Sequence, residues 1–469
     1  MAATEDGHDA FRVYTPLAQQ LETQPTFPLC EALFAAAALL ALLHALAPLL
    51  RRGGGSAAPP YRRLVFLAIC LLGGAANDVF FMCLPLVDNF WHAQGTLMLD
   101  ARLPAYIPCV YLAFGYWPCA AAARFAARRP ALPPSAQAAA AALAACVFYA
   151  AFDLVGQKFL WWTWHDTDAG VRARWLGVPV GSTLWTLVHT FVLARLSLAL
   201  LGREEAAAPE AAAEGKTTAE ATRRRTAATP AKPLTPLRAL VSAVVLCTCT
   251  TPLMMVAMGL LQLHQLRLTR APAPPAPGEA ERLTVGGWTV VQQPGCPDWP
   301  TFGLAVTLAV ALLVRGAARG AGGEGRRAFG SATAATVRTA ADYAVALGIG
   351  AYYAVLVAIM ALGRPEDVVS TGVHQQYGPC GVLAADLSGY TRERYLCAAR
   401  FDEDFRFCPG VPLPADGATW YSLCGTAFGQ RHWQYMAAVT TLAVVGTAYF
   451  AMLVLSRPAG EENVKAKRL

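Results

Sequence analysis

The sequence predicts an all-α fold: a polytopic transmembrane helix bundle of about nine spans, with one disulfide-bearing lumenal loop. Three observations predict it. Hydrophobic residues make up 55% of the 469 residues and charged residues only 15%, whereas a soluble domain carries roughly 25% charged residues. The apolar residues come in blocks long enough to cross a bilayer, which takes ~20 residues each. Four cysteines also share one long polar segment near the end of the chain.

Each predicted span is an apolar block that ends at polar, charged or proline-containing sequence. The seventh block is the shortest, with TFGLAVTLAVALLV lying between Pro300 and Arg315. In chain order, the blocks occupy residues 29–50, 64–87, 104–123, 137–160, 177–201, 238–262, 300–315, 339–362 and 436–456.

Basic residues between the spans predict the orientation, because short cytoplasmic loops retain positive charge. An exterior N-terminus places the arginine groups that follow spans one, three, five and seven on the cytoplasmic face, together with the tail. The net charge of +7 is explained in this way and does not indicate nucleic-acid binding. The expected partner is the lipid bilayer. These groups are Arg51, Arg52, Arg62 and Arg63, then Arg124, Arg128 and Arg129, then residues 223–225, and finally Arg315, Arg319, Arg326 and Arg327.

The segments between the spans complete the domain organisation. Residues 1–28 are expected to be an exterior or lumenal N-terminal segment, followed by spans one to five (29–201) with a candidate polar pocket. Residues 202–236 are low in hydrophobic residues and predict a disordered cytoplasmic linker. The remaining units are spans six to eight (237–363), a Cys-rich lumenal loop (364–435), span nine (436–456) and a cytoplasmic tail (457–469).

The lumenal loop contains Cys380, Cys397, Cys408 and Cys424. An even number of cysteines in one loop on an oxidising side predicts two disulfides, with three possible connectivities. A zinc site is less favoured, because spacings of 17, 11 and 16 residues contain no close CxxC pair.

The tail ends in KAKRL, with Lys467 third from the end and Lys465 fifth. This is the pattern of a dilysine retrieval signal, which coat proteins read from the cytosolic face. It predicts the endoplasmic reticulum or early secretory pathway as the location and coat proteins as partners of the tail.

Ionisable groups inside spans are the main functional signal, because each costs at least ~2.5–3.5 kcal/mol to insert. Asp78 lies in span two, Asp153 in span four and His189 in span five. The exterior ends of these spans carry further polar residues and are expected to converge on one pocket open to the lumen. The candidate catalytic residues are Asp153, Lys158, His189 and Asp78, and the candidate pocket-lining residues are Asp88, His92, His165, Asp166, Asp168, Ser182 and Thr186.

A second interpretation assigns these groups to helix packing. An Asp–Lys or Asp–His contact would hold the helices together, and the acids of the loops would be hydrated. Lys158 is expected to extend outward to the interface, beside an interfacial belt formed by Trp161, Trp162 and Trp164.

Two chemistries suit a pocket of this kind. A desolvated Asp153 could act as general acid towards the double bond or leaving group of an apolar substrate, with Lys158 and His189 tuning its acidity. Alternatively, a metal ion could activate water, although no HxxxH or HxxEH spacing supports it. The charges could also relay protons or seat a lipid headgroup. No particular cofactor is indicated. The candidate metal ligands are His92, His165, Asp88 and Asp166.

Several stretches resemble a eukaryotic multi-pass membrane family of unknown function: NDVFFMCLPLVDNFWHAQ, FDLVGQKFLWWTWHDTD, GVPVGSTLW, HQQYGPC and YLC. They are spread over most of the chain outside the linker. This resemblance implies no activity.

A local stretch, about residues 153–185, is also similar in layout to the carotenoid hydratase membrane family. DLVGQKFLWWTW is followed by GVP and Trp185, and an acidic residue, a glycine, an aromatic cluster and a downstream GVP recur in that family. The similarity implies that Asp153 holds the acidic position and Gly156 the glycine, with Gly177, Val178 and Pro179 as the GVP. This chain has aspartate where the family usually has glutamate, and it has extra spans and a disulfide loop. The resemblance therefore implies a lipid-like substrate rather than hydration itself.

Together these patterns predict an uncharacterised multi-pass endomembrane protein. Its lumen-facing intramembrane pocket would bind or modify an isoprenoid or other lipid. The alternative is a non-enzymatic transporter or structural membrane protein whose buried acids fix helix packing.

Overall fold

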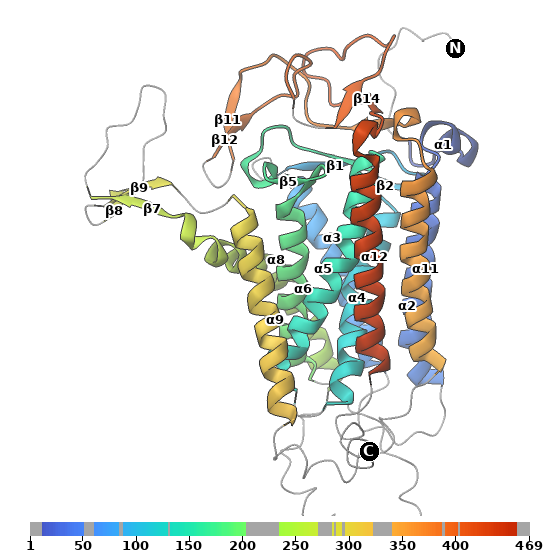
Figure 1. The fold of residues 1–469 in the computed structure, drawn as a ribbon, viewed down its shortest axis with the longest axis vertical. Helices are drawn as coiled ribbons and strands as arrows, with labels where there is room; N and C mark the ends of the chain where they lie inside the picture. Colours follow the sequence, from blue (N-terminus) through green and yellow to red (C-terminus); the bar gives the residue numbers. More distant parts are fainter. Residues whose placement is uncertain are drawn as a thin grey trace, which may run out of the picture.

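The computed structural model describes residues 12–50, 61–83, 88–129, 132–202, 234–270, 284–285, 288–292, 296–321, 340–386, 390–401 and 404–456. Long helices stand side by side, and short strands and loops cover one end of the bundle (Figure 1). The long helices are α2 (Phe27–Leu50), α3 (Arg62–Cys83), α4 (Tyr106–Ala127), α5 (Pro134–Lys158), α6 (Val180–Leu200), α8 (Pro236–Leu261), α9 (Trp299–Ala321), α11 (Ala340–Leu362) and α12 (His432–Leu455).

Eight of the helices in the described ranges are long and apolar enough to cross a membrane, which confirms the predicted multi-pass bundle. The predicted third span corresponds to α4, a helix of 22 residues that is not among these eight. Its tyrosines, Pro118 and Arg124 make it more polar than its neighbours. The short seventh block belongs to α9, a helix of 23 residues. It continues past Arg315 because the following alanines favour helix.

Helix α5 forms the centre of the bundle and contacts α4, α6, α9 and α12. Its alanine-rich run at 138–142 is no more than 1% exposed. Small side chains let neighbouring backbones approach closely, which drives helix association in lipid. Further along α5, the ring of Phe148 stacks on Tyr352 of α11, with centroids 4.0 Å apart. The tyrosine hydroxyl donates a hydrogen bond to the carbonyl oxygen of Phe148 at 2.8 Å.

One acidic residue joins three helices at the end opposite the strands. Asp342 of α11 forms ion pairs with Arg124 and Arg128 from the end of α4, at 2.7 and 3.1 Å. Arg128 also donates a hydrogen bond to the carbonyl oxygen of Val454 in α12. Buried charges need partners of this kind, so the three residues connect α4, α11 and α12.

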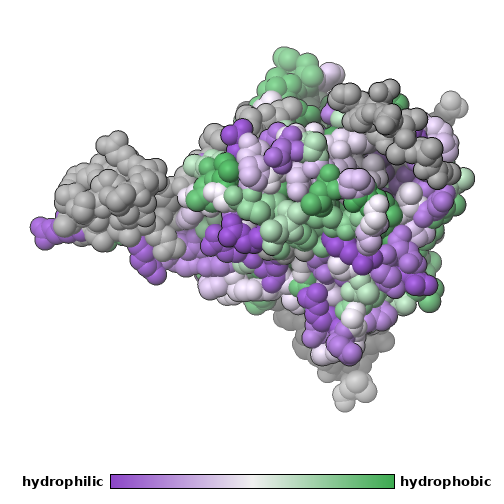
Figure 2. All heavy atoms as spheres, turned by 90° about the horizontal axis from the view of Figure 1, so that it is seen from above, coloured by the Kyte–Doolittle hydropathy of each residue, from purple (hydrophilic) through white to green (hydrophobic). Residues whose placement is uncertain are grey.

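The covered end contains the short elements of the fold. We call the described residues between α11 and α12 the cap, and the antiparallel pair β1 (Phe90–His92) and β4 (Trp162–Trp164) the ribbon. Seen from above in Figure 2, hydrophilic side chains are spread over this face with hydrophobic ones between them. The cap holds a three-stranded sheet, β10 (Val369–Val373), β14 (Trp420–Gly425) and β13 (Phe405–Phe407), and the pair β11 (Leu383–Ala385) and β12 (Thr391–Glu393).

Other short elements surround the ribbon. A short helix, α1 (Leu17–Thr23), precedes α2. The remaining strands are β2 (Met98–Asp100) with β3 (Leu103–Pro104), β5 (Arg174–Trp175) with β6 (Val178–Pro179), and β7 (Arg267–Thr269) with β9 (Trp288–Gln292) and β8 (Thr284–Val285). The 3₁₀ turns are η1 (Ala169–Val171), η3 (Leu263–Gln265), η6 (Pro365–Asp367) and η7 (Gly429–Arg431).

Two disulfides join cap residues, as predicted from the even number of cysteines. Cys380 pairs with Cys397, and Cys408 pairs with Cys424, with Cα atoms 5.2 and 5.0 Å apart. The structure therefore selects one of the three connectivities, in which each cysteine pairs with its neighbour in sequence.

Lys158 attaches the cap to the end of α5. Its side chain is 1% exposed, and its ammonium donates to Asp404 at 2.9 Å and to Thr426 at 3.2 Å. The expectation that Lys158 extends outward to the interface is wrong, because the cap closes over it. Burial raises the pKa of Asp404, but the hydrogen bonds from Thr426 and Lys158 and the lysine charge outweigh that effect and hold the pKa below its usual value.

The prediction of an interfacial belt is also wrong for Trp161 and Trp162, which are 0% and 3% exposed. The indole of Trp161 donates to the hydroxyl of Thr26 at 3.2 Å, so it packs against α2 instead of the headgroup region. Most of the predicted linker (203–233) and the tail with Lys465 and Lys467 lie outside the described residues.

The disulfide pairing can be tested by counting thiols in denatured, unreduced protein. Cys408→Ser should expose one new thiol, that of Cys424, and should lower the free energy of unfolding by roughly 2–5 kcal/mol. The double variant Cys408→Ser/Cys424→Ser should expose none. If the pairs instead cross between the two halves of the cap, the double variant would expose two new thiols, those of Cys380 and Cys397.

Candidate functional site

A cavity of about 310 Å³ lies at the capped end of the bundle. Helices α3, α4, α6 and α8 contribute to its walls, and the ribbon and η1 contribute from above. Most of its lining is aromatic or aliphatic. A few polar side chains are placed among these residues, as is common in pockets for small molecules. The aromatic lining residues are Phe81, Phe90, Tyr111, Tyr149, Trp162, Trp164 and Trp185.

The ribbon presents one face to the cavity because side chains alternate along a strand. Phe90 and His92 of β1 line the cavity, opposite their partners Trp164 and Trp162 of β4. The residue between the two tryptophans, Thr163, points to the other side and bonds to His374 of the cap, with its hydroxyl 3.1 Å from the ring Nδ1. The ribbon therefore connects the cavity to the cap.

Helix α8 supplies the flexible wall of the cavity. Met254, Met255 and Met258 line it, together with Gly259 and Gln262 at the end of the helix. Methionine side chains are unbranched and adapt to irregular shapes. A Cβ atom added at Gly259 would meet no atom within 4 Å, so the wall leaves open space at this position.

Asp78 lies inside the cavity at the end of a hydrogen-bonded chain that joins three helices. Thr251 of α8 donates to Asn77 Oδ1 at 2.9 Å, Asn77 donates to the Tyr111 hydroxyl at 2.9 Å, and that hydroxyl donates to Asp78 Oδ1 at 2.5 Å. Asp78 is 1% exposed. Its second oxygen, Oδ2, has no hydrogen-bond partner among the described residues and lies 4.0 Å from His92 Nε2.

His92 is the second polar group that faces the cavity with unused capacity. The side chain is 7% exposed, and neither ring nitrogen has a hydrogen-bond partner in the described part of the chain. Burial, with a smaller effect from the charge of Arg102, lowers the pKa of His92 to about 3. The imidazole is therefore neutral at neutral pH and offers one donor and one acceptor.

Asp153 does not line the cavity itself but lies behind the side chain of Ser182. Ser182 lines the cavity and donates to Asp153 Oδ2 at 2.6 Å, and Thr186 donates to the backbone oxygen of Ser182 at 3.1 Å. A Cβ atom at Gly156 would lie 2.1 Å from the indole of Trp162. A glycine at position 156 thus has a steric reason, since it leaves room for a ring of the cavity wall.

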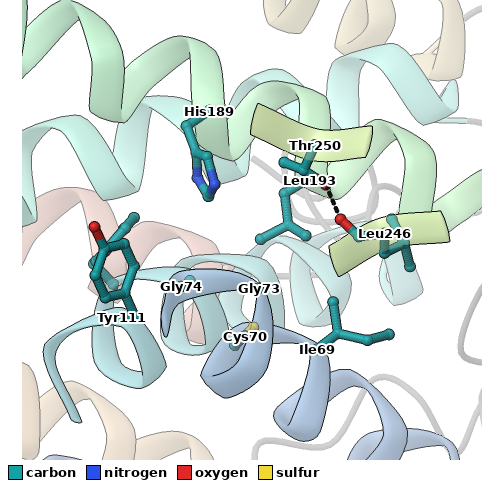
Figure 3. Close-up of a pocket in the computed structure, with 11 residues that line it drawn as sticks. Ile69, Cys70, Gly73, Gly74, Tyr111, His189, Leu193, Leu246 and Thr250 are labelled. Carbon is teal, nitrogen blue, oxygen red and sulfur yellow. Dashed lines mark hydrogen bonds between the residues drawn. The ribbon is translucent and has the colours of Figure 1, made fainter. Parts of the chain in front are cut away.

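His189 belongs to a separate, smaller cavity of about 10 Å³. Figure 3 shows its ring extending from α6 towards the helix that carries Gly73 and Gly74, with Tyr111 beside Gly74 at the left of the view. The ring also stacks on Trp185, with centroids 4.8 Å apart. Because Trp185 lines the larger cavity, its indole stands between His189 and that space.

Three of the remaining predicted pocket residues, Asp88, Asp166 and Asp168, contact the cap. Arg392 of β12 pairs with Asp88 at 3.0 Å and with Asp168 at 2.8 Å. The backbone N–H of Asp166 donates to the side chain of Gln375 in the cap at 2.7 Å, and His165 Nδ1 lies 2.6 Å from the carbonyl oxygen of Asp166.

Apart from His189, which lines the smaller cavity, the structure divides the predicted site residues into two groups. Asp78, His92 and Ser182 line the larger cavity, with Asp153 behind Ser182. Lys158 and the acids of the loops contact the cap instead. The suggested metal ligands His92, His165, Asp88 and Asp166 are divided between these groups. Within the described residues, no three His, Cys, Asp or Glu side chains are placed to hold a metal ion.

Several residues of the cavity and of the cap had no distinctive signal in the sequence. Tyr111 is one of several tyrosines in an apolar helix, and the methionines of α8 are apolar residues of the kind expected in any span. Arg392 and Asp404 lie in a loop with many other charges. The sequence identified the polar residues that occur inside spans, because such residues are unusual there. Their partners are of a type common in their own segments, so only the fold identified them.

The model of one protein family matches residues 9–203 and 305–454. The two segments make up most of the chain, which therefore belongs to this family, described as a domain of unknown function (DUF7802). Helix α8, the methionine wall, lies between the matched segments. No curated protein and no solved structure matches the chain.

The buried histidines predict an acid-sensitive fold. Burial lowers the pKa of His374 to about 4 and that of His92 to about 3, whereas in the unfolded chain both titrate near ~6.5. Between these values the unfolded state binds more protons, so the free energy of unfolding should fall as the pH drops below about 6.5. The slope is ~1.4 kcal/mol per pH unit for each histidine that is protonated only on unfolding.

The variant His374→Asn should reduce the slope of the free energy of unfolding against pH by the contribution of one histidine. The measurement is the thermal unfolding midpoint of purified protein in detergent between pH 7.5 and 4.5. His264→Gln, at a partly exposed side chain (41%), is the matched control and should keep the full slope. An unchanged slope in the His374 variant would contradict the assignment.

Proposed function

We propose that this member of the DUF7802 family binds an amphipathic lipid with an isoprenoid or similar skeleton in the cavity between α3, α4, α6 and α8. One observation carries the proposal. The cavity has aromatic and methionine walls, and the polar side chains that line it include Asp78 and His92, which have buried atoms without a hydrogen-bond partner among the described residues. Apolar walls favour an apolar skeleton, and the two polar groups would fix its polar end.

The position of α8 supports supply from the bilayer. Leu253, Val256 and Leu260 are 44%, 60% and 62% exposed on a helix apolar enough to cross a membrane. Met254 on the same helix is 0% exposed and lines the cavity. One face of α8 would thus contact membrane lipid and the other would contact the bound ligand.

The proposal also assigns roles to the two buried acids. If the lipid is modified as well as bound, Asp78 is the acid that faces it, and Asp153 reaches the ligand only through the hydroxyl of Ser182. The bond between Asp153 and Ser182 joins α5 to α6, which favours a packing role for Asp153, as in the structural alternative. Asp153→Asn should then affect stability more than lipid binding.

The proposed topology places the cap in the lumen. Two lines of reasoning support it: disulfides form in oxidising compartments, and arginines gather at the opposite end of the bundle, where α3 begins and α4 ends. The tail would then be cytosolic, as a dilysine signal requires.

Filling the cavity should abolish lipid binding without disturbing the fold. Gly259→Leu places a side chain in the open space beside Met255 and Met258. Saturable crosslinking of a photoreactive isoprenoid probe to the purified chain in detergent should weaken by at least about tenfold, since each ~1.4 kcal/mol of lost contact is tenfold in affinity.

Gly348→Leu is the matched control, because a Cβ atom there also meets nothing within 4 Å and Gly348 does not line the cavity. It should bind the probe as the unmodified chain does. Equal crosslinking of the Gly259 variant and the unmodified chain would refute the proposed lipid site.

The location can be tested in cells with the full chain. Changing Lys465 and Lys467 together to serine should release the protein from the endoplasmic reticulum to later compartments, because the coat would no longer read the tail. Arg468→Ser leaves both lysines in place and should have no effect. An endoplasmic-reticulum distribution that survives the double change would exclude a dilysine signal.

A further inference from the structure

We infer that the ligand of this cavity is a lipid alcohol, whose uncharged hydroxyl group binds between Asp78 Oδ2 and the imidazole of His92. The inference rests on the proposed function, because it names the chemical class of the lipid that the cavity would hold. It excludes lipid acids, phosphates and amines as the preferred ligands.

The first argument is the unused hydrogen-bonding capacity of the site. Asp78 and His92 are 1% and 7% exposed and line the same cavity. Asp78 Oδ2 and both ring nitrogens of His92 have no partner among the described residues. Leaving buried polar atoms unpaired costs roughly 1–3 kcal/mol for each group. A ligand that pairs with them therefore recovers this free energy.

The second argument is the match of donors and acceptors. A carboxylate only accepts hydrogen bonds, whereas a neutral imidazole donates one and accepts one. A hydroxyl group both donates and accepts, so it can donate to Asp78 Oδ2 and accept from a ring N–H of His92. The carboxylate oxygen and His92 Nε2 are 4.0 Å apart. One oxygen atom can therefore lie about 2.8 Å from both, a normal hydrogen-bond distance.

The third argument is charge. A lipid carboxylate or phosphate would stand beside the carboxylate of Asp78, and two like charges in a buried site repel strongly. Arg102 donates to the carbonyl oxygens of Met82 and Phe90 and does not line the cavity, so a lipid acid in the cavity would not gain a direct ion pair with it.

A lipid amine is disfavoured for the opposite reason. Its ammonium would pair with Asp78, but transferring an ion into a buried site costs several kcal/mol. It would also add a positive charge near Arg102, whose charge already lowers the pKa of His92. A hydroxyl group makes the same contacts without adding a charge.

The test compares three photoreactive probes that share one isoprenoid skeleton and differ only in the end group: a hydroxyl, a carboxylic acid or an amine. Each is titrated at pH 7.5 against the purified full chain in detergent micelles, and the crosslinked fraction is measured. The alcohol should bind at least about tenfold more tightly than the acid or the amine. This comparison uses the unmodified protein, so it does not depend on whether a variant folds.

A variant then connects the selectivity to Asp78. Asp78→Asn keeps an oxygen for the Tyr111 hydroxyl but presents a donor to the ligand and removes the negative charge. Its affinity for the alcohol should fall and its affinity for the acid should rise, so that the preference narrows. Asp416→Asn, at an exposed position of the cap, is the control and should leave all three affinities unchanged.

The possible failures are distinguishable. If the acid or the amine binds as tightly as the alcohol and Gly259→Leu still weakens binding, the inference of a lipid alcohol is overturned while the lipid cavity stands. If Asp78→Asn weakens all three probes equally, Asp78 does not select the end group, which also overturns the inference. If no probe binds, or if Gly259→Leu does not reduce the binding of any of the three probes, the proposed function itself fails.

Discussion

The pairing of Arg392 with Asp88 and Asp168 is the interaction on which the functional end of this protein depends. Asp88 lies just before β1, and Asp168 lies between β4 and η1. Both acids therefore flank segments that line the cavity, and one arginine of the cap holds them together. Arg392 is 6% exposed and Asp168 4% exposed. Removing one partner of a buried pair leaves an uncompensated charge and typically costs 3–5 kcal/mol. The disulfides and the Lys158–Asp404 contact fix the cap that carries this arginine.

The unpaired polar atoms of Asp78 and His92 belong to residues that line the large cavity. Hydrocarbon offers no water to a buried polar group, so such groups usually find protein partners. Asp342 is paired with two arginines, and the Tyr352 hydroxyl donates to a backbone oxygen. At the cavity, by contrast, Asp78 keeps one oxygen unpaired beside an imidazole that is also unpaired. Asp153 also has one oxygen without a partner among the described residues, but it does not line the cavity, so the proposed ligand site is centred on Asp78 and His92.

The sequence predicted the ionisable residues of the spans better than it predicted their roles. Asp78 and Asp153 were both identified as costly to insert, but only Asp78 faces the cavity directly. Lys158 was expected at the interface, whereas the cap encloses it. Trp161 and Trp162 were expected in a headgroup belt, whereas both are buried in protein. These errors have a common cause: a residue near the end of a span can face lipid, water or a folded loop, and hydropathy does not distinguish these surroundings.

The sequence by itself determined that the chain crosses a membrane many times, because long apolar blocks can satisfy their backbone groups in lipid only as helices. It also determined that the loop cysteines form two disulfides, because their number is even and they share one segment. The tertiary structure decided which cysteines pair, which acid faces the cavity, and that methionines of α8 and aromatic rings of the ribbon form its walls. These features depend on contacts between residues far apart in the chain, such as Arg392 with Asp88 and Thr251 with Asn77. Local periodicity and composition do not encode such distances.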